Sequence, residues 1–184
     1  MVVEPEGKRI GLLHELVPDE EKIGVLFNPN SANASSHLAD IEAAGNSLGL
    51  ELVIINVSDE SGLGNAFAWI DEQQIGALLV AADPLFSGRI ERVASLAIEY
   101  HLLAVFSLRN DALAGGLMSY GPSLTDSYRQ LGIYTGRVPK GEKPADMPVW
   151  QTVKFELVIN LKSARAIDFD VPHSLLARAD EVIE

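Results

Sequence analysis

The 184-residue sequence contains no cysteine. This absence excludes disulfide bonds, thiolate catalysis and zinc sites built from cysteine ligands. It suits an exported bacterial protein as well as a cytosolic one, so the cysteine content leaves the compartment open.

Basic residues are scarce as well. The chain has 14 lysines and arginines against 26 aspartates and glutamates, which gives a formal net charge of -12. Binding to a nucleic-acid backbone requires a basic footprint. We therefore expect no nucleic-acid partner.

Long apolar runs are also missing, since none approaches the roughly 20 residues that a membrane-spanning helix needs. Residues 1–7 lack the basic and apolar regions of a secretory signal. From these observations we expect either a cytoplasmic protein or a chain that lacks its native beginning.

Signals for catalysis, metals and cofactors are absent from the pattern. The four histidines are dispersed, without the spacing of a metal site. The sequence has no glycine-rich nucleotide loop and no nucleophile elbow. We predict a protein that is not an enzyme and that needs no metal or cofactor. The histidines are His14, His37, His101 and His173.

What is present is organised around the segment from Lys22 to Leu48. Lys-Ile-Gly-Val-Leu-Phe at residues 22–27 is typical of a strand buried on both faces. Turn residues follow at 28–31, and an apolar stripe at three- and four-residue spacing predicts a helix up to Leu48. This order of strand, loop and helix is the first half of a βαβ unit.

The same alternation continues along the chain. It predicts a single α/β domain over residues 1–184 whose parallel sheet is covered by helices on both faces, a three-layer sandwich. Further strands are expected at residues 51–57, 76–81, 102–106 and 117–121, and helices at 7–16, 63–73, 90–100 and 111–114.

The tail after residue 121 follows a different pattern. A helix at 123–136 and a polar connector at 140–146 precede an edge strand at 154–160. A short helical turn at 163–166 and a terminal helix at 172–183 complete the expected elements. The chain is therefore expected to leave the main sheet after Gly121 and to return near Lys154.

Three loops follow strands at their carboxyl ends, where open parallel sheets bind ligands. The amides and hydroxyls of the first loop and its helix can hold an anion, or they shape the turn and cap the helix. In the second loop, an aspartate is suited to a ligand ammonium or to capping. The candidate ligand-binding residues are Asn28, Asn30, Ser35, Asp83, Phe86, Phe106 and Ser107.

The two aromatic candidates also have alternatives. Phe86 and Phe106 suit stacking on an aromatic or apolar ligand, but a phenylalanine at a strand end, such as Phe106, is more often a core residue. Arg109 in the third loop either clamps a carboxylate or carries a solvated charge.

Several motifs resemble the substrate-binding proteins of bacterial ABC transporters. The matching segments are Val25-Leu-Phe-Asn-Pro29, Gly115-Gly-Leu-Met-Ser-Tyr-Gly121, Gly141-Glu-Lys-Pro-Ala-Asp146, Lys154-Phe-Glu-Leu-Val-Ile-Asn-Leu-Lys162 and Ser174-Leu-Leu-Ala-Arg-Ala-Asp-Glu-Val-Ile-Glu184.

The resemblance implies a type I periplasmic-binding fold, in which two α/β lobes enclose a ligand cleft. It also implies amino-acid ligands, aromatic ones among them, an ABC permease as partner, and a periplasmic or lipid-anchored location. This chain resembles the second lobe (residues 7–121) followed by the C-terminal segments (122–184): crossover helix, returning strand and terminal helix.

We therefore expect the small-molecule-binding component of an ABC importer, in a one-lobe or truncated form. The alternative is a regulatory or assembly module that keeps the fold without import. In either case the helix at 123–136 lacks a first lobe to pack against, so its apolar stripe favours a homo-oligomer.

Overall fold

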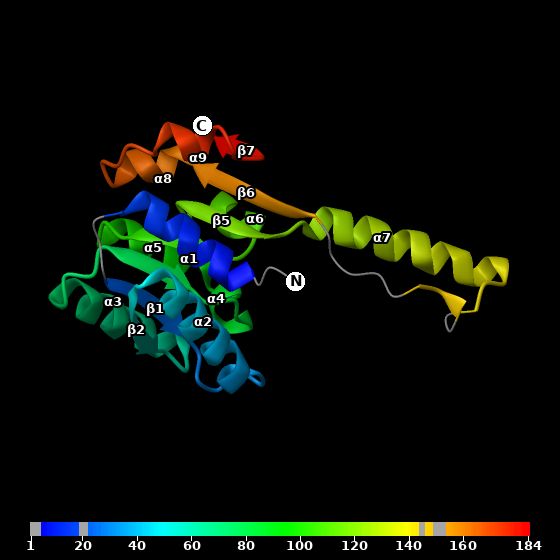
Figure 1. Ribbon diagram of the computed structural model, residues 1–184, viewed down its shortest axis with the longest axis horizontal. Coiled ribbons are helices and arrows are strands. Elements are labelled where there is room, and N and C mark those ends of the chain that lie inside the picture. The colour runs from blue at the N-terminus through cyan, green and yellow to red at the C-terminus, as the bar shows by residue number, and fades with distance from the viewer. Residues whose placement is uncertain (1–4, 19–21, 144–145, 149–153) are drawn as a thin grey trace.

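The computed structural model describes residues 5–18, 22–143, 146–148 and 154–184 (Figure 1). Its strands form one seven-stranded sheet in the order β2-β1-β3-β4-β5-β6-β7. All neighbours are parallel except β5 and β6. The strands are β1 (Lys22–Phe27), β2 (Glu51–Asn56), β3 (Ala77–Val80), β4 (Leu103–Phe106), β5 (Met118–Pro122), β6 (Phe155–Asn160) and β7 (Glu181–Ile183).

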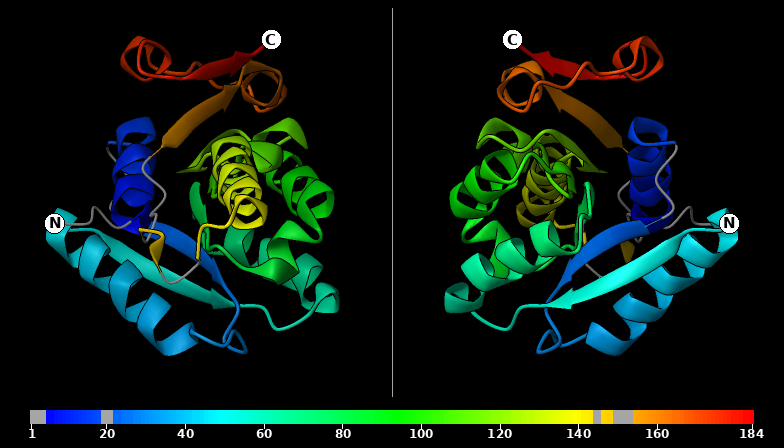
Figure 2. Two further views of the ribbon diagram at one scale, coloured as in Figure 1. Left: turned by 90° about the vertical axis from the view of Figure 1, so that its right-hand side faces the viewer. Right: turned by 90° about the vertical axis from the view of Figure 1, so that its left-hand side faces the viewer.

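Helices cover both faces of this sheet (Figure 2). One apolar core lies under α1 and α2, and the other lies under α3 and α5. The helices are α1 (Pro5–Leu16), α2 (Ala34–Leu48), α3 (Leu63–Glu72), α4 (Pro84–Ser87), α5 (Ile90–Glu99), α6 (Arg109–Leu113), α7 (Leu124–Arg137), α8 (Leu161–Ala166) and α9 (His173–Leu176), with 3₁₀ turns η1 (Glu60–Gly62) and η2 (Val138–Lys140).

The predicted three-layer α/β sandwich is confirmed, and the reason is visible in β1. Five of its six residues are buried, and successive side chains enter opposite cores. Val25 belongs to the core under α1 and α2, whereas Leu26 belongs to the core under α3 and α5. A strand covered on both faces must be apolar throughout, which is the pattern that the sequence shows.

Two predictions for the tail were wrong. Strand β6 is not at the edge, because it pairs with β5 on one side and β7 on the other. The terminal helix ends at Leu176, and Glu181–Ile183 forms β7 instead. Asp180 decides this outcome: its N–H donates to the Leu157 carbonyl, and its carboxylate accepts from the Leu157 N–H at 2.8 Å.

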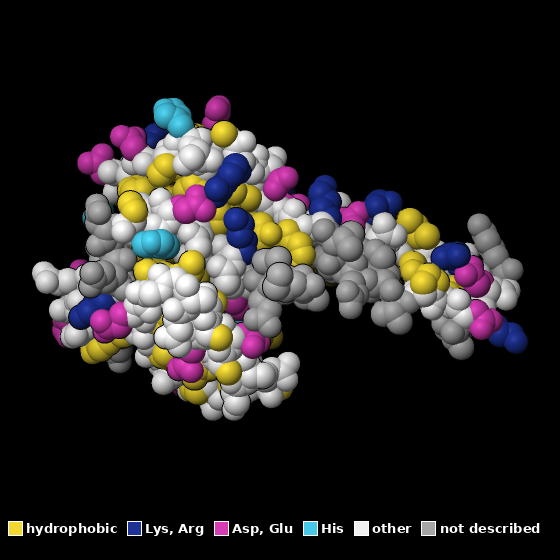
Figure 3. All heavy atoms as spheres, in the orientation of Figure 1, with side chains coloured by type: hydrophobic (Ala, Val, Ile, Leu, Met, Phe, Trp, Pro, Cys, Tyr) yellow, Lys and Arg dark blue, Asp and Glu magenta, His cyan; other side chains and the backbone are white. Residues whose placement is uncertain are grey.

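Helix α7 projects from the body of the molecule (Figure 1), and apolar side chains lie on the surface of this projection (Figure 3). Ser123 caps it, because the Ser123 hydroxyl accepts from the Asp126 N–H. None of its residues is buried. As predicted, the chain leaves the sheet after β5 and rejoins it at β6, beside the strand it left.

Candidate functional site

The topology creates a crevice between β1 and β3. These strands are neighbours, yet α2, which follows β1, lies on one face and α5, after β3, lies on the other. The loops after the two strands therefore diverge at the carboxyl edge of the sheet. In open α/β sheets this switch point is where ligands bind.

Asp83 links the loops after β1 and β3 through its carboxylate. One carboxylate oxygen accepts hydrogen bonds from the Asn28 side-chain amide at 3.0 Å and the Leu85 N–H at 2.8 Å. The other accepts from the Ser31 hydroxyl at 2.6 Å. Burial raises the pKa of Asp83, but the hydrogen bonds from Ser31, Asn28 and the Leu85 N–H outweigh it, and the net pKa lies below the ordinary value. The carboxylate is therefore ionised at neutral pH and its bonds join the first loop to the second.

The remaining first-loop candidates lie at the rim. Asn30 is exposed, and its backbone N–H donates to the Asn28 side-chain oxygen at 3.0 Å. Ser35 is exposed in the first turn of α2, and Asn33 at the N-cap makes no side-chain cap. The structure thus brings Asn28 and Asp83 together and leaves Asn30 and Ser35 open to solvent.

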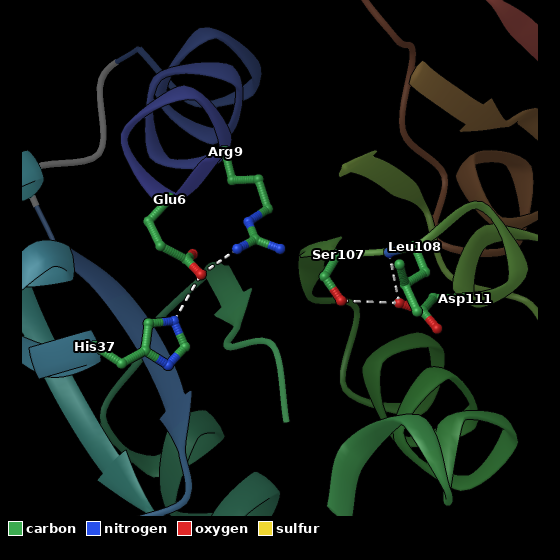
Figure 4. A network of polar contacts seen from close by, with 6 residues as sticks. All are labelled: Glu6, Arg9, His37, Ser107, Leu108 and Asp111. Carbon is green, nitrogen blue, oxygen red and sulfur yellow. Dashed lines mark hydrogen bonds and ion pairs between the residues drawn. The ribbon is translucent and has the colours of Figure 1, made fainter. Parts of the chain in front are cut away.

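A second polar cluster borders the same edge (Figure 4). Glu6 of α1 bonds Arg9 one turn along the helix and also lies 2.6 Å from Nε2 of His37 on α2. Glu6 and Arg9 are both buried, and Arg9 is only 2% exposed. Burial lowers the pKa of Arg9, while the attraction of Glu6 and, more weakly, of Asp111 opposes that shift.

Ser107 faces this cluster from the loop after β4 (Figure 4). Its hydroxyl donates to the Asp111 carboxylate at 3.4 Å, and the Leu108 N–H donates to the same oxygen at 2.8 Å. Burial raises the pKa of Asp111 above its ordinary value, although the Leu108 and Ser107 bonds work against it. Ser107 is thereby held directly after β4, two residues before α6.

A cavity of about 490 Å³ lies where these clusters meet. This volume is in the range of pockets that hold small molecules. The cavity is lined by Pro5, Glu6, Arg9, Ala82, Asp83, Pro84, Ser87, Ser107, Leu108 and Pro122.

A second cavity of about 430 Å³ lies beside the first. It shares Ala82 and Pro84 with the first and adds Ser31 of the first loop together with His37 and Asp40 of α2. The loop after β3 therefore borders two hollows at the carboxyl edge.

The aromatic candidates lie in the core. Phe86 and Phe106 are each 1% exposed and belong to the apolar cluster under α3 and α5. Neither lines the two cavities at the switch point. The packing therefore favours the core alternative for Phe106, and it gives Phe86 a core position that the sequence analysis did not consider. Arg109 does clamp a carboxylate, but it is that of Glu181 in β7, through two bonds of 2.6 and 2.7 Å.

Within the part of the chain that the structure describes, no three acidic, histidine or cysteine side chains gather as a metal-binding group. In the same residues, no helix has the length and apolarity to cross a bilayer. The carboxyl edge thus offers hydrogen-bonding and charged groups around a hollow, a set suited to holding a small polar molecule.

Comparison with known sequences identifies the family. The ABC transporter substrate binding protein family matches residues 3–183, nearly the whole chain. The protein belongs to this family. The resemblance carried by the sequence motifs is thereby confirmed.

One curated relative of this substrate-binding protein is the tyrosine-binding protein of Clostridioides difficile strain R20291. The two are 25% identical over 165 residues, which are 88% of this chain and 46% of the relative. The chain thus spans less than half the length of that protein.

Solved structures show the same fold. A conserved domain protein from Vibrio cholerae has a TM-score of 0.84 at 23% identity. An ABC domain from Streptococcus pneumoniae in complex with L-Trp has a TM-score of 0.83 at 24% identity. In both cases the match covers 97% of this chain and 60% of the solved one. The prediction that this chain has the fold of a single α/β lobe like those of type I periplasmic-binding proteins is therefore confirmed.

The amino-acid pattern of this substrate-binding protein does not mark Glu6 and Arg9 as cavity residues, or His37 as a partner of Glu6. The only local signal is the acid–base pair of Glu6 and Arg9 at i,i+3 spacing, which is usual on any solvated helix face. Glu6 and Arg9 meet His37 and the β4 loop, which are distant from them in sequence, only in the folded chain.

Proposed function

We propose that this protein is the ligand-binding component of an ABC-type importer, and that its ligand is an amino acid or a related small molecule. The observation that carries the proposal is the cavity at the carboxyl edge of a chain that belongs to the substrate-binding family. Relatives named for tyrosine and crystallised with L-Trp support aromatic amino acids as the first candidates. A family that binds substrates gives no reason to assign catalysis.

The proposed partner is an ABC permease, and the proposed location is the periplasm or a lipid-anchored position at the membrane. In a two-lobed receptor, closure about a hinge buries most of the ligand. This chain would supply one wall of such a cleft. On its own, one wall makes about half of the contacts of a closed cleft, which weakens ligand binding by several kcal/mol. We therefore expect this chain alone to bind its ligand with millimolar rather than micromolar affinity.

The test is a nuclear magnetic resonance titration of the ¹⁵N-labelled chain with the common amino acids, aromatic ones first. We expect saturable shifts for amides in the loops after β1, β3 and β4. Replacing Ser107 with alanine removes a hydroxyl at the cavity wall and should weaken binding roughly threefold to tenfold. Ser95→Ala, at an exposed position of α5 on the other face, is the matched control.

Absence of saturable shifts with every amino acid, together with a permanent dimer, would contradict the proposal. That combination would favour the alternative of a regulatory or assembly module.

A further inference from the structure

Helix α7 and the turn after it carry three aliphatic residues at a seven-residue spacing. These are Leu124, Leu131 and Val138, and the last of them opens the 3₁₀ turn η2. Leu131 and Val138 are exposed, and Leu124 is only partly buried. A seven-residue apolar repeat is the pattern by which two helices pair along a seam. A second helix with the same repeat would remove these side chains from water.

The repeat is symmetric about its middle residue, Leu131. In an antiparallel pair of α7 helices centred there, Leu131 of each copy lies opposite Leu131 of the other, and Leu124 lies opposite Val138. Tyr128 and Tyr134 obey the same relation on either side of the seam. A two-fold axis through Leu131 therefore matches apolar residues with apolar residues along the helix, as a self-complementary interface requires.

Charge favours the antiparallel arrangement over the parallel one. The first turn of α7 carries Asp126 and the last turn carries Arg137. Antiparallel pairing brings the acidic end of one helix beside the basic end of the other and opposes the two helix dipoles. Each chain also has a net charge of -12, and α7 projects away from the body (Figure 1). Antiparallel helices therefore place the two acidic bodies at opposite ends of the pair, whereas parallel helices would place them side by side.

The base of α7 lies next to the cavity of about 490 Å³. Pro122 lines this cavity, and Leu124 follows two residues later. Among the described residues, none after Pro122 contributes to the lining, so α7 does not cover the cavity of its own chain. The antiparallel register places Val138 of a second copy opposite Leu124. It thereby brings the end of the second α7 to the rim of the cavity.

We propose that two copies of this chain pair through antiparallel α7 helices, and that the end of each α7, with Val138, forms part of the rim of the other copy's cavity. The pairing is argued from the helix alone, whereas the rim contribution rests on the proposed function. A ligand that gains contacts from the second copy must strengthen the dimer by the same coupling free energy. Ligand binding and pairing therefore depend on each other.

The absence of cysteine from the chain allows a direct test of the helix orientation. A chain with Leu124→Cys and a chain with Val138→Cys are mixed, equilibrated and mildly oxidised. We expect a mixed disulfide between the two variants and no disulfide when either variant is oxidised alone, because only the mixed pair comes within bonding distance. Disulfides within each variant alone would indicate parallel helices, and no disulfide in the mixture would indicate no pairing at this register. Either result would overturn the proposal.

Tryptophan binding tests the rim contribution. Leu131→Glu places a charge in the seam, two helical turns from the cavity, and should separate the copies. We expect it to weaken tryptophan binding about threefold to tenfold in the amide titration, the loss of one apolar contact from the second copy. Ile133→Glu is the matched control, because it makes the same kind of change at an exposed position on the opposite side of α7. It should bind tryptophan as the wild type does.

The outcomes separate this inference from the proposed function. Equal tryptophan binding by Leu131→Glu and the wild type would overturn the rim contribution and leave the proposed function intact. Binding of no amino acid by the wild type would overturn the proposed function and the rim contribution together. In that case the disulfide test would still decide the antiparallel pairing, since it needs no ligand.

Discussion

Asp83 joins two loops that are far apart in the sequence. Its partners Asn28 and Ser31 lie 55 and 52 residues away, and all three side chains belong to the carboxyl edge of the sheet. Charge-assisted bonds of this kind are stronger than neutral ones. The shape of the crevice between β1 and β3 therefore depends on one ionised side chain.

Replacing Asp83 with asparagine should destabilise the fold by about 1–3 kcal/mol at neutral pH, because hydrogen bonds to a charged acceptor are weakened. The folded pKa of Asp83 lies below the ordinary value of 3.8. The stabilisation is therefore fully present above about pH 4 and is lost as the pH falls through the folded value. Thermal melts of wild type and Asp83→Asn across this range should converge in acid.

The matched control for this prediction is Asp71→Asn, at an exposed position near the end of α3. We expect its melting temperature to follow that of the wild type at every pH. A penalty for Asp83→Asn that is the same in acid as at neutral pH would show that the charge contributes nothing.

At this scale the sequence predicted some roles and not others. Asp83 was expected to cap a helix or to bind a ligand, and the capping bond to the Leu85 N–H is local enough to predict. Its bonds to Asn28 and Ser31 depend on strand order, which one sequence does not reveal. Arg9 was missed because a charged residue on a helix is usually solvated, and only tertiary packing buries this one.

At the scale of elements, β5 approaches the end of β4 closely. A β-carbon built on Gly121 would overlap the backbone carbonyl oxygen of Ser107. Only glycine allows this approach, which holds Ser107 beside the cavity. The position of Ser107, a candidate binding residue, thus depends on a glycine, Gly121, in the neighbouring strand β5.

Gly121→Ala should therefore destabilise the protein by about 1–3 kcal/mol or more, since the overlap is with backbone and cannot be relieved by a side-chain rotation. Chemical denaturation measures the loss, and amide shifts of Ser107 and Leu108 should report the displaced loop. Gly11→Ala is the control: the added methyl group on α1 meets no atom within 4 Å. It should be neutral or stabilise by up to about 1 kcal/mol. A Gly121→Ala protein as stable as wild type would contradict the close approach.

The elements of residues 22–122 could be predicted because each strand is a short apolar run followed by turn residues. The end of the chain could not. Residues 174–184 contain enough apolar positions for a helix, but pairing of Val182 with Ile159 and the bonds of Asp180 to Leu157 favour a strand. Those partners lie more than 20 residues away, so the local periodicity of the sequence cannot predict that this segment pairs as a strand.

At the scale of the whole molecule, α7 stands apart from the two cores. Leu124, Tyr128 and Leu131 recur at three- and four-residue spacing and form one apolar stripe. Tyr128 is 69% exposed and Leu131 is 61% exposed. The sequence predicted the stripe, and within the described residues no α7 side chain is buried. The exit at Gly121 and the return near Lys154 could be located from composition.

We propose that a second copy of the chain covers this stripe, so that the protein is a homo-oligomer. Full burial of a side chain of this size contributes about 1.5–3 kcal/mol to the free energy of association. Several such side chains must be buried together to hold two chains, so we expect two α7 helices to pair along the stripe. Leu131→Glu places a charge within the stripe and should shift the protein to the monomer. Light scattering coupled to size exclusion at micromolar concentration measures the change. The control is Thr125→Glu, outside the stripe on the same helix, which we expect to remain associated.

Because each chain carries a net charge of -12, added salt should strengthen the wild-type assembly by screening repulsion between the chains. A wild-type monomer at every salt concentration would refute self-association through α7.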